Sequence, residues 1–215
     1  QHLAEGETTD VVVSYTATDS HGAVSNVSTL TITVTGVNDA PVTAADTNAG
    51  NEDTTISGSV TGNDDDVDSD DSAASLTYAL TGPAPAGLTF NGDGSYSLDA
   101  SNAAYQHLAD GATTNVVANY TVTDEHGATS GATLTITLTG TNDAPVAVAD
   151  TNAGSEDSII TGTVASNDSD VDDGATLSYS LDAAVAGLTL NPDGSYSFDA
   201  ANAAYQHLAQ GATTD

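Results

Sequence analysis

The sequence contains no lysine and no arginine among its 215 residues, but it has 31 aspartates and glutamates, which gives a formal net charge of -31. No carboxylate can therefore be neutralised by a basic side chain of the same chain, and self-repulsion on this scale destabilises a compact state. Nucleic acids and anionic membrane surfaces are bound mainly through lysine and arginine, so we expect neither of them as a partner. Multivalent cations from solution are the expected source of neutralisation.

Cysteine is also absent, which excludes disulfide bonds and thiolate metal sites. No apolar run approaches the roughly 18 to 20 residues of a membrane span, so membrane insertion is not expected. The first ten residues, QHLAEGETTD, lack the basic and apolar regions of a secretory signal peptide. Either export uses another signal or the sequence is an excerpt from a longer chain, and the internal repeats favour the second.

The sequence repeats itself with a period of about 100 residues, which is the size of one small domain. The segment QHLA begins at Gln1, Gln106 and Gln206, and the segment NDAPV begins at Asn38 and Asn142. Self-similarity at this period indicates a tandem array of domains.

The boundaries of the repeats can be drawn in two ways. If units begin after each NDAP segment, the chain holds the C-terminal part of one repeat at 1–40, a complete repeat at 41–144 and the N-terminal part of a third at 145–215. Counting from QHLA gives an alternative frame of 1–105 and 106–205. The sequence alone leaves both frames open.

Alternating apolar and polar residues predict that short β-strands dominate each repeat. In residues 28–36, STLTITVTG, the residues Leu, Ile and Val alternate with Thr, and residues 132–140, ATLTITLTG, repeat the pattern. Because 38% of the residues are hydrophobic and follow this regular pattern, we reject the competing interpretation of an acidic disordered chain. Further strands are expected at 11–17, 116–122, 54–60, 75–80, 158–164 and 176–181, and in the hairpins around the turns NGDG and NPDG.

About seven short strands in each repeat of about 100 residues predict an all-β fold of tandem immunoglobulin-like β-sandwiches. A closed barrel fits this strand count less naturally. One short helix per repeat is expected at residues 102–111, NAAYQHLADG, where Gly111 would end it. Each core would be small and would contain no tryptophan, so bound ions would matter for stability.

Four motifs in a fixed order resemble VCBS repeats, the cadherin-like modules of RTX-type bacterial surface adhesins. They are AAYQHLADG at 103–111, YTVTDEHGATS at 120–130, TLTITLTGTNDAPV at 133–146 and EDSIITGTVASNDSDVD at 156–172. The resemblance implies an extracellular array, exported by type I secretion and stiffened by calcium at and near its junctions. It also implies a stalk that projects an adhesive tip for cell-surface or biofilm attachment, with neighbouring repeats of the same chain as partners.

A candidate calcium site lies in the acidic loop that each repeat carries. Calcium binds roughly six to eight oxygen ligands in forgiving geometry, and a short loop of aspartates and small residues can supply several of them. The loop NDDDVDSDD at 63–71 aligns with its copy NDSDVDDGA at 167–175. Asp65 faces a serine in this alignment and is expendable, while Asp70 and Asp71 are interpreted as surplus solvating charge. The matched positions are Asn63, Asp64, Asp66, Asp68, Asn167, Asp168, Asp170 and Asp172.

The D-x-D spacing in both loops resembles the cadherin motif in which two aspartates reach one calcium ion, at Asp66 with Asp68 and at Asp170 with Asp172. By the same analogy, three chain segments converge on each domain boundary. The ligands carried over in this way are Asn38, Asp39, Asn142 and Asp143 of the NDAP linkers, Glu52, Asp53, Glu156 and Asp157 of the ED pairs, and Asp19 and Asp124 at strand ends of the preceding domain.

The alternative to an ion site is that these loops are solvated turns, since aspartate favours turns. The lack of basic residues and the presence of two copies favour calcium. Magnesium demands a tighter octahedral site and keeps its waters, so it fits the loops less well. Zinc is disfavoured because the five histidines form no His-x-x-x-His pair and there is no cysteine.

Enzyme chemistry is not expected. Asp19, Ser20 and His21 are adjacent in the sequence, but adjacent residues point in different directions and cannot form a catalytic triad. The copy of this segment reads DEH and lacks the serine. Two other functions stay open: a glycan- or protein-binding immunoglobulin-like module, and a homotypic, fibre-forming repeat that exchanges strands or domains with other copies of the chain.

Overall fold

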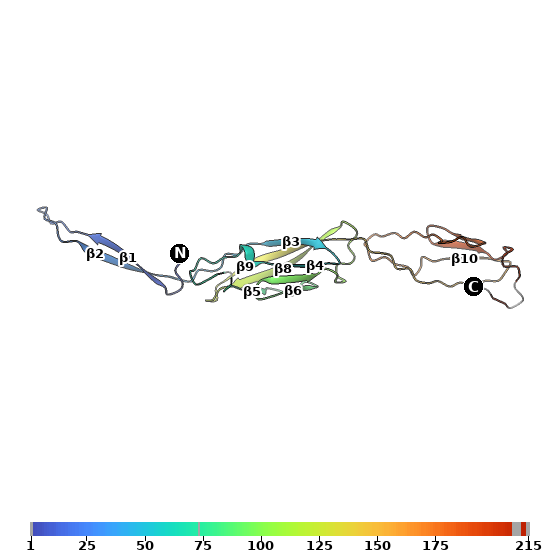
Figure 1. Ribbon diagram of the computed structural model, residues 1–215, viewed down its shortest axis with the longest axis horizontal. Helices are drawn as coiled ribbons and strands as arrows, with labels where there is room; N and C mark the ends of the chain where they lie inside the picture. Colours follow the sequence, from blue (N-terminus) through green and yellow to red (C-terminus); the bar gives the residue numbers. More distant parts are fainter. Residues whose placement is uncertain (1, 73, 208–211, 214–215) are drawn as a thin grey trace. The chain divides into compact units, whose positions relative to one another are not determined.

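Figure 1 shows the computed structural model, which describes residues 2–72, 74–207 and 212–213. Within these residues the regular structure consists of twelve β-strands and one short 3₁₀ turn, η1 (Thr61–Asn63). No helix in this part of the chain is long and apolar enough to cross a membrane. The chain divides into two compact units, Gln1–Tyr105 with Thr113–Thr139, and Gln106–Ala112 with Gly140–Asp215. The predicted all-β fold class is confirmed.

The first unit begins with a two-stranded hairpin of β1 (Thr8–Tyr15) and β2 (Ser28–Thr35). The strands are antiparallel, with Val11 opposite Ile32 and Val13 opposite Leu30. Every residue of both strands is exposed. The alternating pattern therefore forms the predicted strands here, but their apolar face is not buried.

The first unit also contains a complete seven-stranded sandwich, as the strand count predicts. One sheet has the order β3-β9-β8-β5 and the other has the order β4-β7-β6. β3 runs parallel to β9, whereas the other neighbouring strands are antiparallel. The strands are β3 (Asp46–Asn51), β4 (Thr55–Ser59), β5 (Thr77–Leu80), β6 (Leu88–Phe90), β7 (Ser95–Asp99), β8 (Thr113–Thr123) and β9 (Thr129–Thr139).

The core of this sandwich lies between the two sheets and follows the period of two along the strands. In β8, Ala118, Tyr120 and Val122 are buried while Val117 is exposed. The Tyr120 ring lies against Phe90 of the opposite sheet, with ring centroids 5.7 Å apart. The amphipathic alternation that predicts the strands thus also places the core.

The second unit contains one three-stranded sheet in the order β10-β12-β11, of which β10 is labelled in Figure 1. Its strands, β10 (Ile159–Thr163), β11 (Leu188–Leu190) and β12 (Ser195–Asp199), repeat the arrangement of β4, β6 and β7. The strand expected at 176–181 does not form. Its counterpart β5 is held by β8 in the first unit, and no described strand of the second unit corresponds to β8.

The short helix expected at 102–111 is wrong. The segment forms successive turns, in which the Tyr105 amide donates to the Asn102 carbonyl at 2.9 Å and the Ala112 amide donates to the Ala109 carbonyl at 2.8 Å. The Asn102 side chain accepts the Ala104 amide at 3.1 Å, which offers the backbone a local alternative to helical bonds. The matching segment of the second unit begins with the same turn at Asn202, and its residues 208–211 lie outside the described residues.

Candidate metal site

In the first unit, the acidic loop 63–71 follows β4 and η1 and is pinned to the linker before the sandwich. The backbones of Val42 and Asp65 exchange two hydrogen bonds, of 2.8 and 3.0 Å. The Asp39 amide donates to the Asp68 carboxylate at 2.8 Å. Asp64, Asp66 and Asp68 are all buried, so these three aspartates are not the exposed residues of a solvated turn.

Asp66, Asp71 and Asp124 form the acidic cluster of the first unit. One carboxylate oxygen from each lies within 4.8 Å of the others. Burial, followed by the charges of Asp71 and Asp68, raises the pKa of Asp66 above its usual range. The fold therefore disfavours an uncompensated negative charge at this position.

Several oxygen atoms of this region are buried and have no hydrogen-bond partner. Asp66 accepts the Asp68 amide at 3.1 Å through Oδ1, and Asp68 accepts the linker amide through Oδ2. Each carboxylate is thus oriented by one oxygen while its second oxygen is left over. The unpartnered atoms are Asn38 Oδ1, Asp66 Oδ2, Asp68 Oδ1 and Asp71 Oδ2.

Asp124 lies in the turn between β8 and β9. Its Oδ1 accepts the amides of His126 and Ala128, both at 2.9 Å, and its Oδ2 accepts the Asn38 amide group at 3.1 Å. Although burial raises the pKa of Asp124, the hydrogen bonds from Asn38 and the turn lower it overall. Asp124 is therefore held as a carboxylate beside Asn38, in the linker that precedes its own sandwich.

Asp71 was missed by the comparison of the two sequence copies. Its counterpart in the second copy is Ala175, so the comparison removed it as surplus charge. The structure places it in the cluster with Asp66 and Asp124. The charge of Asp71 raises the pKa of Asp66, and this effect depends on the folded loop, which brings the two carboxylates close together.

Asp64 is buried beside the cluster but has a different environment. Its Oδ1 accepts the Ala44 amide at 3.0 Å. Burial raises the pKa of Asp64 above its usual range; the hydrogen bond from Ala44 lowers it in part, and the charge of Asp46 raises it further. Burial, together with the negative charges of Asp64 and Asp46, raises the pKa of Tyr78 to about 12. Asp64 therefore fastens the start of the sandwich to the loop, and Asn63 next to it is exposed.

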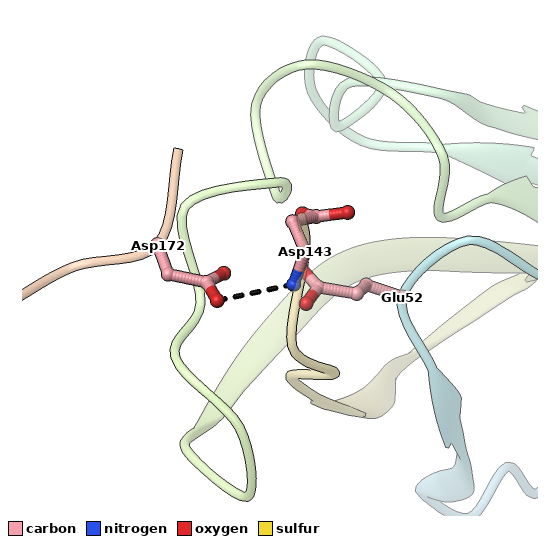
Figure 2. A group of neighbouring side chains, drawn as sticks. All are labelled: Glu52, Asp143 and Asp172. Carbon is pink, nitrogen blue, oxygen red and sulfur yellow. Dashed lines mark hydrogen bonds between the residues drawn. The ribbon is translucent and has the colours of Figure 1, made fainter. Parts of the chain in front are cut away.

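The second unit repeats this pattern of hydrogen bonds. The Asp143 amide donates to the Asp172 carboxylate at 3.1 Å, as Figure 2 shows. The Asp172 amide donates to Asp170 at 2.9 Å, and the Val148 amide donates to Asp168 at 2.6 Å. Asp172 Oδ1 is buried without a hydrogen-bond partner. The D-x-D loop therefore has the same local structure in both copies.

Two predicted ligands of the second unit are not drawn into this pattern. Asn142 and Asn167 are exposed. The Asn142 side chain donates to the backbone carbonyl of Asp143 at 2.7 Å. This hydrogen bond orients the backbone of the linker and does not involve a carboxylate.

The ED pairs lie a few residues before β4 and β10 in the sequence. Glu52, which Figure 2 also draws, belongs to the first unit, is 1% exposed and donates its amide to the Thr139 carbonyl at 3.0 Å. Because β3 runs parallel to β9, this places Glu52 at the end of the sheet opposite the β8–β9 turn. Asp53 and Asp157 are exposed turn residues with φ of 65° and 64°, and Glu156 is exposed.

Asp19 occupies the same kind of turn as Asp124, between β1 and β2. Its Oδ1 accepts the amides of His21 and Ala23 at 2.9 and 2.8 Å. Asp19 is exposed and is absent from the acidic groups found among the described residues. Its role as a ligand stays a prediction, as do the roles of the other residues assigned by analogy.

Comparison with known protein families gives two matches along the chain. Residues 38–140 match the family model of the bacterial cadherin-like domain, and residues 142–213 match that of the bacterial Ig domain. Along the chain, a segment similar to a bacterial cadherin-like domain is thus followed by one similar to a bacterial Ig domain. Both domain types are typical of surface and secreted proteins, and neither is an enzyme family.

Solved structures of cadherin ectodomains are similar to the chain. A protocadherin gamma B7 fragment with domains EC3–6 has 17% identity and a TM-score of 0.48, with 89% of this chain and 50% of that chain covered. A protocadherin gamma B2 fragment with domains EC1–5 has 16% identity and a TM-score of 0.49, with 88% and 38% covered. Mouse protocadherin-24 EC1–3 has 14% identity and a TM-score of 0.48, with 94% and 69% covered. The chain spans half of the first of these, and among proteins of curated function none matches it.

Proposed function

We propose that the chain is a calcium-rigidified extender, a stalk segment of a large bacterial surface adhesin that projects an adhesive tip for attachment to cells or within a biofilm. The observation that carries this proposal is the cluster of Asp66, Asp71 and Asp124, whose carboxylates converge in a chain without lysine or arginine. Buried like charges are unfavourable unless a cation binds among them. Binding of a divalent ion converts this repulsion into a cross-link between three segments of the chain.

The donor set of the cluster fits calcium. In the linker and the acidic loop of the first unit, the buried side-chain atoms that lack a hydrogen-bond partner are carboxylate or amide oxygens, on Asn38, Asp66, Asp68 and Asp71. Hard oxygen donors in an irregular loop suit calcium, whereas zinc favours nitrogen and sulfur and magnesium demands strict octahedral geometry. Asp124 adds a carboxylate that the turn already holds in place. These five residues would hold the ion in the first unit, and Asp143, Asp170 and Asp172 are the proposed ligands of the second.

Calcium would act as a signal of the extracellular compartment. Extracellular modules bind calcium with dissociation constants of roughly 0.1 to 1 mM, so the site would fill outside the cell and stay empty before export. The bound ion would stabilise the folded state by linkage. The resemblance to VCBS repeats of RTX-type adhesins supports type I secretion, and neighbouring repeats of the same chain are the proposed partners of each domain.

Thermal unfolding with calcium and with a chelator tests the proposal. We expect calcium to raise the melting temperature of the chain, and Asp66→Asn and Asp71→Asn to remove most of this increase because each deletes a ligand. Asp110→Asn is the matched control and should keep the full increase, since Asp110 lies in an exposed turn and is in none of the acidic groups found among the described residues.

Small-angle scattering tests whether the bound ion also makes the chain rigid. We expect the distribution of distances within the chain to narrow when calcium is added and to broaden again with the chelator. An unchanged melting temperature together with an unchanged maximum dimension would contradict the role of a calcium-rigidified extender.

A further inference from the structure

The turn between β6 and β7 has the sequence NGDG, at residues 91–94. It holds the only asparagine–glycine pair of the chain, Asn91-Gly92. The Gly94 amide donates to the Asn91 carbonyl at 3.0 Å, which closes a β-turn with Gly92 and Asp93 at its centre. Asn91 and Gly92 are both exposed. No residue of this turn belongs to the candidate metal site, so the chemistry of the turn is a separate question.

The Gly92 amide nitrogen is open to reaction with the side chain before it. No hydrogen bond from this amide is found among the described residues. Glycine has no Cβ that would hinder the approach of its nitrogen to a neighbouring group, and even a Cβ added at Gly92 would meet only the Tyr78 carbonyl oxygen, at 4.0 Å. The Asn91 carboxamide donates one hydrogen bond, to Ser95 Oγ at 2.9 Å. The Gly92 nitrogen and Asn91 Cγ can therefore close a succinimide ring.

The second unit forms the same turn with one chemical difference. The Gly194 amide donates to the Asn191 carbonyl at 2.9 Å, and the Asn191 side chain donates to Ser195 Oγ at 2.9 Å, as in the first unit. The residue after Asn191 is Pro192. Proline has no N–H, so its nitrogen cannot form this ring. The chain thus contains a reactive and an unreactive copy of one turn.

We propose that Asn91 is a site of spontaneous deamidation, with Gly92 as the nucleophile and water as the only co-reactant. The Gly92 nitrogen loses its proton and attacks Asn91 Cγ, so that an N–Cγ bond forms, the Cγ–Nδ2 bond breaks and ammonia leaves with a proton. Water then opens the succinimide: its hydroxyl group adds to a ring carbonyl carbon and its proton returns to the Gly92 nitrogen. Opening at Cγ gives aspartate, and opening at the main-chain carbonyl gives isoaspartate. This inference does not depend on the calcium site.

Either product places a second carboxylate beside Asp93. Ser95 Oγ accepts the Asn91 carboxamide and donates its hydrogen to Asp93 Oδ1 at 2.6 Å. A hydroxyl group has a single hydrogen and cannot serve two carboxylates. Because the chain has no lysine or arginine to neutralise the new charge, deamidation replaces a hydrogen bond within the turn by repulsion.

Isoaspartate also lengthens the main chain between residues 91 and 92 by a methylene group. The Gly92 carbonyl accepts the Tyr78 amide at 3.0 Å. Tyr78 belongs to β5 of the sheet β3-β9-β8-β5, whereas the turn connects two strands of the sheet β4-β7-β6, so this hydrogen bond links the two sheets. A displaced Gly92 would leave the amide of the buried Tyr78 without its acceptor, which is unfavourable. The isoaspartate form should therefore be the less stable product.

Peptide mapping by mass spectrometry, after incubation of the full chain at neutral and at mildly alkaline pH, tests the reaction. We expect Asn91 to deamidate faster than any other asparagine and Asn191 to stay intact. The rate should rise with pH because the Gly92 nitrogen must lose its proton. An isoaspartate-specific methyltransferase should label the product at position 91. Failure of Asn91 to convert, or equal conversion of Asn91 and Asn191, would overturn the proposal.

Exchanging the residues that follow the two asparagines tests the role of the backbone amide. Gly92→Pro should fold, because Pro192 occupies the same turn with the same hydrogen bonds, and it should abolish deamidation at Asn91. Pro192→Gly should introduce deamidation at Asn191. Continued reaction in the first variant, or none at Asn191 in the second, would show that the turn amide is not the nucleophile.

Thermal unfolding before and after the incubation tests the consequence for the sandwich. We expect the incubated chain to melt at a lower temperature than the fresh chain and Gly92→Pro to show no change. Asn91→Asp supplies the new charge without lengthening the main chain, so it should melt between the fresh chain and the isoaspartate form. An incubated chain that is deamidated at Asn91 but melts like the fresh chain would contradict the proposed link between the turn and the two sheets.

Discussion

Tyr120 and Tyr78 are neighbours in the sandwich core, with ring centroids 6.3 Å apart, yet their hydroxyl groups differ in environment. The Tyr120 hydroxyl donates to Asp46 Oδ2 at 2.6 Å, whereas the Tyr78 hydroxyl is buried without a hydrogen-bond partner. Hydrogen bonds to charged groups contribute more to stability than neutral ones, and a buried hydroxyl without a partner is unfavourable. The two tyrosines therefore contribute differently to stability although both are buried in the core.

We expect Tyr120→Phe to lower the free energy of unfolding by about 1.5 to 3 kcal/mol, because the carboxylate of Asp46 loses its donor. Tyr78→Phe, which removes a hydroxyl that has no partner, should leave the stability unchanged or increase it slightly. Denaturant unfolding of the two variants in chelator measures both values without a contribution from calcium. A larger loss for Tyr78→Phe than for Tyr120→Phe would contradict this interpretation.

The strands show which parts of the fold could be predicted from the sequence. β2 and β9 have a strict alternation of apolar residues and threonine, and both form as predicted. β3 (DTNAGN) has no such alternation and was not predicted, because the parallel edge of β9 holds it in the sheet. Segment 176–181 has the alternation but no neighbouring strand among the described residues, and it forms no strand. Alternation thus identifies strands that are able to form, while a neighbouring strand decides whether they do.

The close packing of β4 on β7 allows a test at the level of one element. A methyl group on Gly58 would lie 2.5 Å from the Tyr96 hydroxyl oxygen and 2.8 Å from its ring, whereas a methyl group on Gly62 would meet nothing within 4 Å. We expect Gly58→Ala to destabilise the sandwich by about 1 to 3 kcal/mol through overpacking. Gly62→Ala, its control, should have a much smaller effect, and thermal unfolding in chelator compares the two.

The candidate site shows the limit of a comparison between copies. The D-x-D loop was predicted from its two copies, and both copies form the same hydrogen bonds to their linkers. The same comparison discarded Asp71, because a copy can only support residues that both repeats keep. The position of Asp124 next to Asn38 depends on the β8–β9 turn, which brings residues 86 positions apart into contact. The frame of the repeats, whether 41–144 or 106–205, stays a prediction.

At the scale of the whole molecule, the acidic composition predicts opposite responses to pH with and without calcium. The pKa values of Asp64 and Asp66 are raised above 3.8 in the folded state, mainly by burial. The folded state therefore takes up these protons at higher pH than the unfolded state, so their contribution to stability grows as the pH falls towards 3.8 and is lost as the pH rises.

In chelator, we accordingly expect a higher melting temperature at about pH 4.5 than at about pH 7.5. In saturating calcium the order should reverse, because protons compete with the ion for the same carboxylates. Differential scanning calorimetry at the two pH values, with the Asp110→Asn variant as a control for general charge, measures the four melting temperatures. The same order of melting temperatures in both conditions would show that the buried carboxylates do not hold the ion.

Each linker amide is fastened to the acidic loop of the domain that follows it. Asp39 bonds to Asp68 and Asp143 bonds to Asp172, and both pairs are 29 residues apart. The residues that fix the linker before a domain thus lie within the first third of that domain's own sequence. None of these hydrogen bonds comes from the domain before it. A gene encoding such an array could gain or lose one unit by recombination and still encode a correctly started domain at every new position.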